Sequence, residues 1–238
     1  MFLYPDNRHF SRNYNSEEKE TPFFQDVQRL MCRKDCFRDW EYPAVLAALG
    51  VEPGLTYLCI GGFGDALAIW LSHVVSLLHV VDRVGHEAVR DYPLSYGQYW
   101  NQETDFITGD WCEIANHCNQ YDRIFSVGSV EHNLTARDVL FMWQVGQHLR
   151  PGGRAVITTE WGEQYAYDAD MPPPRNVVGG HIYDNAAIQQ RLVMPSGLRM
   201  TEWQENPIDW SAIEQEAPFI GRSIVRFMPA LIVLDKHG

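Results

Sequence analysis

A glycine-rich turn and an acidic residue on the next apolar run form the most suggestive chemical pattern in this sequence. Residues 58–68 read LCIGGFGDALA, with Gly61, Gly62 and Gly64 between an apolar run and a helix-like run. Such glycines let the backbone approach a ligand, and the helix that follows offers unpaired N–H groups. Asp82 ends the next apolar run, where a carboxylate can accept hydrogen bonds from both ribose hydroxyls. The pattern predicts a ribose-containing cofactor; the alternative is that the glycines only permit tight strand–helix packing.

The spacing of the glycines separates two classes of cofactor. A dinucleotide-binding turn requires a third glycine three residues after the second. If Gly62 and Gly64 are the first two, Leu67 stands where that glycine belongs. An NAD-linked oxidoreductase is therefore disfavoured, and it stays open as an alternative.

His132 and Glu160 are the candidate catalytic residues. His132 follows the fourth apolar run and Glu160 lies near the end of the fifth, so both are expected at the carboxyl edge of a parallel sheet, where open α/β folds bind ligands. A histidine there can take a proton from a substrate oxygen or nitrogen; alternatively it bonds only to backbone. Glu160 is the reserve candidate. Glu160, His181 and Asp110 lack the spacing of a dedicated metal site, so no metal is predicted.

The elements that must position these residues alternate along the chain. Apolar runs predict strands at TYLCI, SLLHVVD, DFITGD, YDRIFSVGS and RAVITTEW, and helical periodicity follows Asp65 and covers residues 135–149. The segment 150–153, RPGG, is predicted to end the second helix and lead into the fifth strand. Two late strands, LRMTEWQ and MPALIVLD, follow a long connection. The alternation predicts an α/β fold with a parallel sheet and helices on both faces.

In this order the segments resemble the class I S-adenosylmethionine-dependent methyltransferases, from about Leu55 to Lys236. LCIGGFGD resembles the first cofactor motif, VVD the acid-ended second strand, TGDW the adenine segment, YDRIFSVGSVEHN the fourth-strand motif and LRPGGRAVIT the fifth-strand signature. The resemblance implies S-adenosylmethionine as cofactor and a Rossmann-like sheet of order 3-2-1-4-5-7-6 with strand 7 antiparallel. It also implies that Asp110 and Trp111 flank the adenine and that Ser126 belongs to the cofactor site.

Three residues depart from the family pattern. Cys59 stands where the family usually has an acid, and Phe63 and Asp65 occupy positions where glycine is common. Phe63 must therefore point away from the methionine tail of a bound cofactor, because otherwise the two would clash.

Composition limits the function classes. The net charge of −12 argues against nucleic acid as a partner, because phosphate binding depends on clustered Lys and Arg. No apolar run reaches the roughly 18 residues of a membrane span. The N-terminus lacks the pattern of a secretion signal, so a cytoplasmic protein is expected. The odd number of cysteines, five, does not suggest a disulfide framework.

The 238 residues are expected to form one main domain. Residues 1–50 are predicted as an N-terminal arm and helical lid, and residues 51–238 as the cofactor-binding domain with a substrate loop at 163–198. The predicted function is methyl transfer to an oxygen or nitrogen of a small molecule. A non-catalytic cofactor-binding or scaffold protein is the alternative from another class, and a homodimer is left open.

Overall fold

The computed structural model describes residues 2–3, 36–63, 65–83, 100–101, 103–114, 121–133, 136–167, 180–201 and 228–238. The strands are β1 (Phe2–Leu3), β2 (Thr56–Ile60), β3 (Leu77–Asp82), β4 (Asp105–Thr108), β5 (Tyr121–Val127), β6 (Leu149–Trp161), β7 (Ala166–Tyr167), β8 (His181–Ile182), β9 (Arg199–Met200) and β10 (Met228–Asp235). The helices are α2 (Cys36–Leu49), α3 (Ala66–Val74), the 3-10 turn η4 (Val130–His132), α5 (Arg137–His148), α6 (Asn185–Ala187), the π-helical turn η6 (Ile188–Val193) and α7 (Met194–Ser196).

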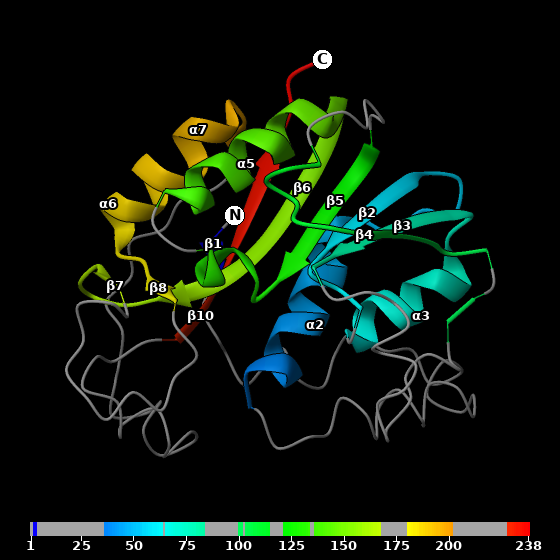
Figure 1. Ribbon diagram of the computed structural model, residues 1–238, viewed down its shortest axis with the longest axis horizontal. Helices are drawn as coiled ribbons and strands as arrows, with labels where there is room; N and C mark the ends of the chain where they lie inside the picture. The colour runs from blue at the N-terminus through cyan, green and yellow to red at the C-terminus, as the bar shows by residue number, and fades with distance from the viewer. Residues whose placement is uncertain are drawn as a thin grey trace.

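One sheet runs through the molecule in the order β4-β3-β2-β5-β6-β10 (Figure 1). Strands β2 to β6 run parallel to one another, whereas β10 is antiparallel to β6. Strands β1 and β9 both pair with β10, antiparallel to it. Counted without β1, the order is the predicted 3-2-1-4-5-7-6, with the antiparallel strand in the predicted place. The fold prediction is confirmed.

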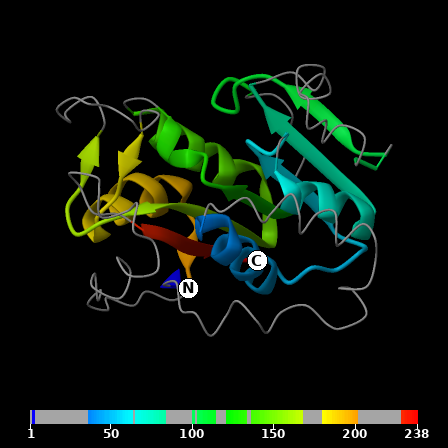
Figure 2. The ribbon, with the colours of Figure 1, turned by 90° about the horizontal axis from the view of Figure 1, so that it is seen from below.

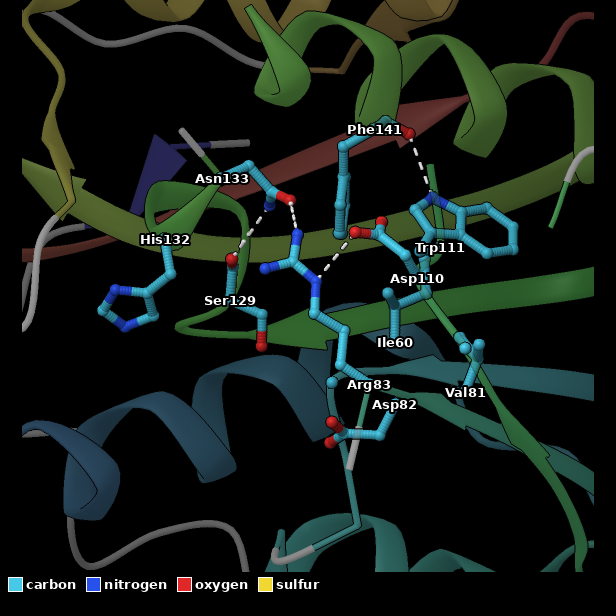
Figure 3. Close-up of a pocket in the computed structure, with 12 residues that line it drawn as sticks. Ile60, Val81, Asp82, Arg83, Asp110, Trp111, Ser129, His132, Asn133 and Phe141 are labelled. Atoms are coloured by element: carbon cyan, nitrogen blue, oxygen red, sulfur yellow. Dashed lines mark hydrogen bonds and ion pairs between the residues drawn. The ribbon is translucent and has the colours of Figure 1, made fainter. Parts of the chain in front are cut away.

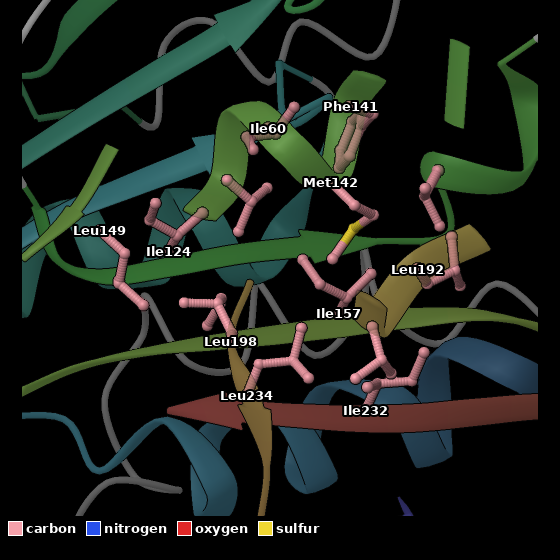
Figure 4. Packing of buried hydrophobic residues seen from close by; sticks show 14 of the residues in the cluster. Ile60, Ile124, Phe141, Met142, Leu149, Ile157, Leu192, Leu198, Ile232 and Leu234 are labelled. Carbon is pink, nitrogen blue, oxygen red and sulfur yellow. The ribbon is translucent and has the colours of Figure 1, made fainter. Parts of the chain in front are cut away.

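Helices cover both faces of this sheet (Figure 2). One core packs α2 and α3 against one face and includes Leu49, Leu67 and Val80. The other core packs α5 and the helical stretch 185–196 against the opposite face; it includes Met142 and Leu192 (Figure 4). The strands are apolar on both sides because both of their faces are buried.

Helix α2 packs directly against the sheet. Val45 and Leu49 are fully buried against the sheet. Arg123 and Arg154 donate to the carbonyl oxygens of Leu49 and Ala48 at 2.8 and 3.1 Å, which satisfies carbonyls that a helix C-terminus leaves unpaired. The predicted lid over residues 1–50 stays a prediction, because residues 4–35 lie outside the described part of the chain.

Two element boundaries differ from the sequence prediction. Strand β6 begins at Leu149, directly after α5, so residues 150–153 belong to the strand instead of preceding it. The register between β5 and β6 shifts there, because β6 holds extra residues opposite β5. The late strand predicted at LRMTEWQ is described only as the two-residue β9, and residues 202–204 lie outside the described part.

Candidate functional site

The glycine turn after β2 brings bare backbone to the carboxyl edge of the sheet. Gly61 has a φ of +76°, and its N–H donates to the carbonyl of Val81 at 2.7 Å. A β-carbon at Gly61 would collide with the hydroxyl of Ser129, and one at Gly62 would collide with the sulfur of Cys59. Both positions therefore require glycine for steric reasons. Gly64 lies outside the described residues.

The two unusual residues of this turn face inward. Phe63 is buried and packs edge-to-face on Phe106, with ring centroids 5.3 Å apart. It is not among the residues that line the cleft described below. Asp65 caps α3, because its carboxylate accepts hydrogen bonds from the N–H groups of Leu67 and Ala68 at 2.8 and 3.3 Å. Phe63 and Asp65, which depart from the usual glycine pattern, therefore stabilise the turn itself.

An open cleft of about 200 Å³ lies at this edge, where β2, β3, β4 and β5 end (Figure 3). The residues that line it are Ile60, Gly61, Val81, Asp82, Arg83, Gly109, Asp110, Trp111, Ser129, His132, Asn133 and Phe141. Of the predicted site residues, five gather here: Gly61, Asp82, Asp110, Trp111 and His132. Ligands of open α/β sheets bind at this edge.

Asp82 ends β3 beside the glycine turn. Its carboxylate accepts a hydrogen bond from the N–H of Phe63 at 3.3 Å, which ties the end of β3 to the turn after β2. The side chain is half-buried and lines the cleft. A carboxylate in this position has lone pairs for further donors, such as a pair of hydroxyl groups.

Asp110, just after β4, is held by three donors. One oxygen accepts from the N–H of Cys112 at 2.9 Å, and the other contacts Arg83 and Arg137 at 3.0 and 2.8 Å. Partial burial raises the pKa of Asp110, but the bond from Cys112 and the two guanidinium charges outweigh it, so the pKa lies below its usual value. Asp110 is thus an ionised anchor for two cations.

Trp111 forms part of the cleft wall, and its side chain is held in place by contacts within the protein. Its indole N–H donates to the carbonyl oxygen of Phe141 at 3.1 Å, and its ring lies against those of Phe141 and His148. The side chain is buried. Trp111 therefore contributes apolar surface to the cleft, and its N–H is already used within the protein.

Arg83, Ser129 and Asn133 line the cleft without having been predicted. Arg83 extends from the end of β3 between Asp110 and Asn133 (Figure 3). Its terminal nitrogen donates to Oδ1 of Asn133 at 3.0 Å. The amide nitrogen of Asn133 in turn donates to the carbonyls of Ser129 and Val130. The available signal was position: Arg83 directly follows Asp82, and the other two flank η4.

The two predicted catalytic residues, His132 and Glu160, and the predicted cofactor residue Ser126 lie in different places. His132 in η4 is exposed and lines the cleft, pointing away from Asp82 and Asp110 (Figure 3). Ser126 is fully buried in β5, and its hydroxyl donates to the carbonyl of Ile60 at 2.9 Å. Glu160 lies in β6 opposite Pro229 of β10. Neither Ser126 nor Glu160 lines the cleft.

The predicted substrate loop places aromatic residues beside η4. His181 in β8 is buried, and its Nε2 lies 2.8 Å from the carbonyl oxygen of Asn133. Its Nδ1 lies 2.8 Å from the hydroxyl of Tyr165, and the ring of Tyr167 lies 4.6 Å from the imidazole. Asn133 thus links two parts of the molecule: it lines the cleft, and its backbone carbonyl contacts His181. Residues 168–179 of the loop lie outside the described part.

No three His, Cys, Asp or Glu residues in the described ranges form a group that could hold a metal ion. In the same ranges no helix is long and apolar enough to cross a membrane.

Comparison with solved structures identifies the architecture. No protein-family profile and no curated protein sequence matches the chain. An S-adenosylmethionine-dependent methyltransferase from Mesorhizobium loti superposes with a TM-score of 0.57 at 20% identity, over 82% of this chain and 97% of the other. This is the class I methyltransferase fold. A Burkholderia thailandensis 1,6-didemethyltoxoflavin-N1-methyltransferase, solved with S-adenosylhomocysteine, superposes with a TM-score of 0.58 at 16% identity, over 90% and 82% of the two chains.

A protein named as a cyclase, rather than as a methyltransferase, also superposes on this chain. The cyclase SpnF superposes with a TM-score of 0.58 at 13% identity, over 82% of this chain and 79% of the other. At these identities the likeness concerns the fold, and the reaction has to be argued from the residues of the cleft.

Proposed function

We propose that this protein binds S-adenosylmethionine in the cleft and transfers its methyl group to a small molecule. The observation that carries the proposal is the meeting of Gly61 and Asp82 in one cleft. A backbone without a side chain and a carboxylate that can accept hydrogen bonds from ribose hydroxyls lie at adjacent strand ends, which suits an adenosyl cofactor. The solved methyltransferases of the same fold support this choice.

The residues of the cleft fit this cofactor in kind. Gly61 lines the cleft without a side chain, Asp82 offers its carboxylate to ribose hydroxyls, and Asp110 offers acceptor oxygens to the adenine amine. Ile60 and Val81 add apolar surface. S-adenosylmethionine supplies a methyl group already activated on a sulfonium sulfur, so the protein has to position the acceptor, exclude water and accept a proton.

A dinucleotide fits the same turn poorly. The pyrophosphate of such a cofactor binds at the N-terminus of the helix after β2. In this protein the carboxylate of Asp65 lies at that terminus and accepts hydrogen bonds from the N–H groups of Leu67 and Ala68. A pyrophosphate would meet like charge at a helix terminus where two N–H donors are already used. This argues for an adenosyl cofactor over NAD.

We place the methyl acceptor between η4 and the described part of the substrate loop. His132 lines the cleft and is the proposed proton acceptor, while Tyr165 and Tyr167 offer aromatic surface. Aromatic faces and a net charge of −12 favour a neutral or cationic small molecule. The acceptor atom is proposed to be an oxygen or a nitrogen.

Calorimetric titration with S-adenosylhomocysteine tests the cofactor assignment. Asp82→Ala is expected to weaken binding by about 1.5–3 kcal/mol, because hydrogen bonds to a charged group are lost. This corresponds to roughly 10- to 150-fold in Kd. Asp105→Ala is the matched control: it removes a carboxylate that is 70% exposed at the start of β4, at the opposite edge of the sheet.

The control variant should bind as the wild type does. Equal affinity of folded Asp82→Ala and wild type would remove Asp82 from the ribose site. Binding of NADH in place of S-adenosylhomocysteine would replace the proposed cofactor with a dinucleotide.

A further inference from the structure

Arg83 crosses the cleft that the proposed function assigns to the cofactor. Its backbone directly follows the end of β3, and its side chain extends to the opposite wall (Figure 3). There Nε lies 3.0 Å from Oδ2 of Asp110, and a terminal nitrogen donates to Oδ1 of Asn133 at 3.0 Å. One side chain thus connects the ends of three segments: β3, β4 and η4.

This guanidinium and an adenine amine compete for the same acceptor. Oδ2 of Asp110 already contacts both Arg83 and Arg137, and Oδ1 accepts from the N–H of Cys112. A carboxylate has about four lone-pair positions, so three of them are in use before a ligand arrives. Removing Arg83 from Oδ2 leaves Asp110 ionised and anchored, because Arg137 stays.

The space beside Arg83 is small for a complete cofactor. The cleft measures about 200 Å³, whereas small-molecule sites usually measure about 300–1,000 Å³. Arg83 is a lining residue with many rotatable bonds, and its side chain is 52% exposed. Moving it toward solvent enlarges the cleft without shifting a strand.

The contacts of Arg83 are weak enough to break. Asp110 is 19% exposed and Arg83 is half-exposed, and ion pairs near a protein surface change an equilibrium constant only a few-fold. Asn133 keeps its bonds to Ser129 and Val130 when Arg83 leaves. The opened arrangement therefore retains the rest of the site.

We propose that Arg83 is a latch across the adenine end of the cleft, and that it limits the affinity for the cofactor. This rests on the proposed cofactor. The latch is closed when Arg83 contacts Asp110 and Asn133, and it opens when the adenine amine takes the place of the guanidinium at Asp110. Part of the ligand's binding free energy is spent on this opening. If Arg83 instead stayed in place and stacked on the adenine, its removal would weaken binding, so the two roles differ in sign.

The test measures S-adenosylhomocysteine binding to three variants by calorimetry. Arg83→Ala and Arg83→Met, which keeps the apolar stem, should bind roughly 3- to 10-fold more tightly than the wild type, in line with the loss of one surface ion pair and its hydrogen bond. Arg137→Ala is the matched control, because it removes the other cation from the same oxygen of Asp110 but does not line the cleft. It should not tighten binding.

Salt provides a second readout. Screening weakens the closed latch, so the affinity difference between the wild type and Arg83→Ala should shrink between about 0.05 and 0.5 M NaCl. Equal or weaker binding by both Arg83 variants would overturn the latch and leave the cofactor assignment standing. If no protein, including the wild type, bound S-adenosylhomocysteine, the proposed cofactor would fail and the latch with it.

Discussion

At the scale of single residues, Cys59 is part of the core, at a position where the methyltransferases that the sequence resembles usually have an acid. It is buried next to the glycine turn, and burial, with the nearby charges of Asp65 and Asp82, raises its pKa well above the usual value. The thiol therefore stays protonated and acts as a small apolar group. Its sulfur fills the space that a side chain at Gly62 would need.

Gly62→Ala should destabilise the protein by about 1–3 kcal/mol, because the new methyl group collides with the sulfur of Cys59. The measurement is the free energy of unfolding from urea titration. In the double variant Cys59→Ala/Gly62→Ala the collision is removed, so its loss should be smaller than the sum of the two single losses. Strict additivity would show that the two positions do not share this space.

His132→Ala should lower turnover by roughly 10²- to 10⁴-fold, the range for loss of a general base. The measurement is methyl transfer from S-adenosylmethionine across a panel of small amines, phenols and carboxylates. Calorimetry with S-adenosylhomocysteine should show cofactor affinity close to that of the wild type, because the imidazole points away from Asp82 and Asp110 (Figure 3). Full turnover by the variant would leave Glu160 or positioning alone to account for catalysis.

At the scale of elements, one buried carboxylate holds two helices together. Asp138 in the first turn of α5 is fully buried, and its two oxygens accept hydrogen bonds from Arg191 at 2.7 and 2.8 Å. The hydroxyl of Tyr183 donates to it at 3.0 Å. Burial and then the charges of Asp138 and Glu131 raise the pKa of Tyr183 well above its usual value, so the phenol stays a donor. The helical stretch 185–196 is thereby fixed on α5.

Asp138→Asn should reduce the free energy of unfolding by about 2–4 kcal/mol, because a partly buried guanidinium loses its charged partner. Urea titration monitored by circular dichroism measures the loss. The double variant Asp138→Asn/Arg191→Met removes both charges and should recover part of the stability. A double variant less stable than the single one would show that the pair is not the source of the loss.

The strands were predictable because each is a short, continuous apolar run. TYLCI and MPALIVLD match β2 and β10 to the residue, and SLLHVVD and YDRIFSVGS overlap β3 and β5 closely. The start of β6 was not predictable from the sequence, because Pro151 and two glycines are typical of a turn. In the structure these residues belong to β6, where its register with β5 shifts. Tertiary pairing thus decides where local signals conflict.

The site was predictable where chemistry coincides with a strand end. Gly61 and Asp82 lie in the cleft because parallel strands end at the same edge. Arg83 was missed, since one arginine after a strand is usually a solvated residue and only the fold brings Asp110 and Asn133 within its reach. Ser126 does not line the cleft. Side chains alternate between the two faces of a strand, and that of Ser126 points into the sheet, where its hydroxyl donates to the carbonyl of Ile60.

At the scale of the whole molecule, three ion-paired aspartates make the free energy of unfolding depend on pH. Asp110, Asp122 and Asp235 pair with arginines from other elements. Partial burial raises the pKa of Asp122 and Asp235, but hydrogen bonds from Thr56 and Arg150 to the first, and from Arg154 and Thr201 to the second, outweigh it. All three pKa values lie below the usual one, as described above for Asp110.

Because these pKa values are lower in the folded state, the stabilisation is complete above the ordinary aspartate pKa of about 3.9. It is lost as pH falls through the lower folded values. The free energy of unfolding, measured by urea titration at several pH values, should therefore fall steadily below about pH 5. Asp122→Asn should show a shallower fall. A variant whose slope equals that of the wild type would remove Asp122 from this effect.

The position of β10 has a consequence for how the chain acquires its structure. β10 lies between β6 and the short strands β1 and β9, although residues 228–235 come long after β6 in the sequence. Until they arrive, the whole antiparallel edge of β6 has unpaired N–H and C=O groups beside Val156 and Ile157, both fully buried in the finished fold. An open apolar edge of this kind pairs readily with other chains. Pairing so distant in sequence is also slow, which makes the interval before β10 docks the period in which this protein is most exposed to aggregation.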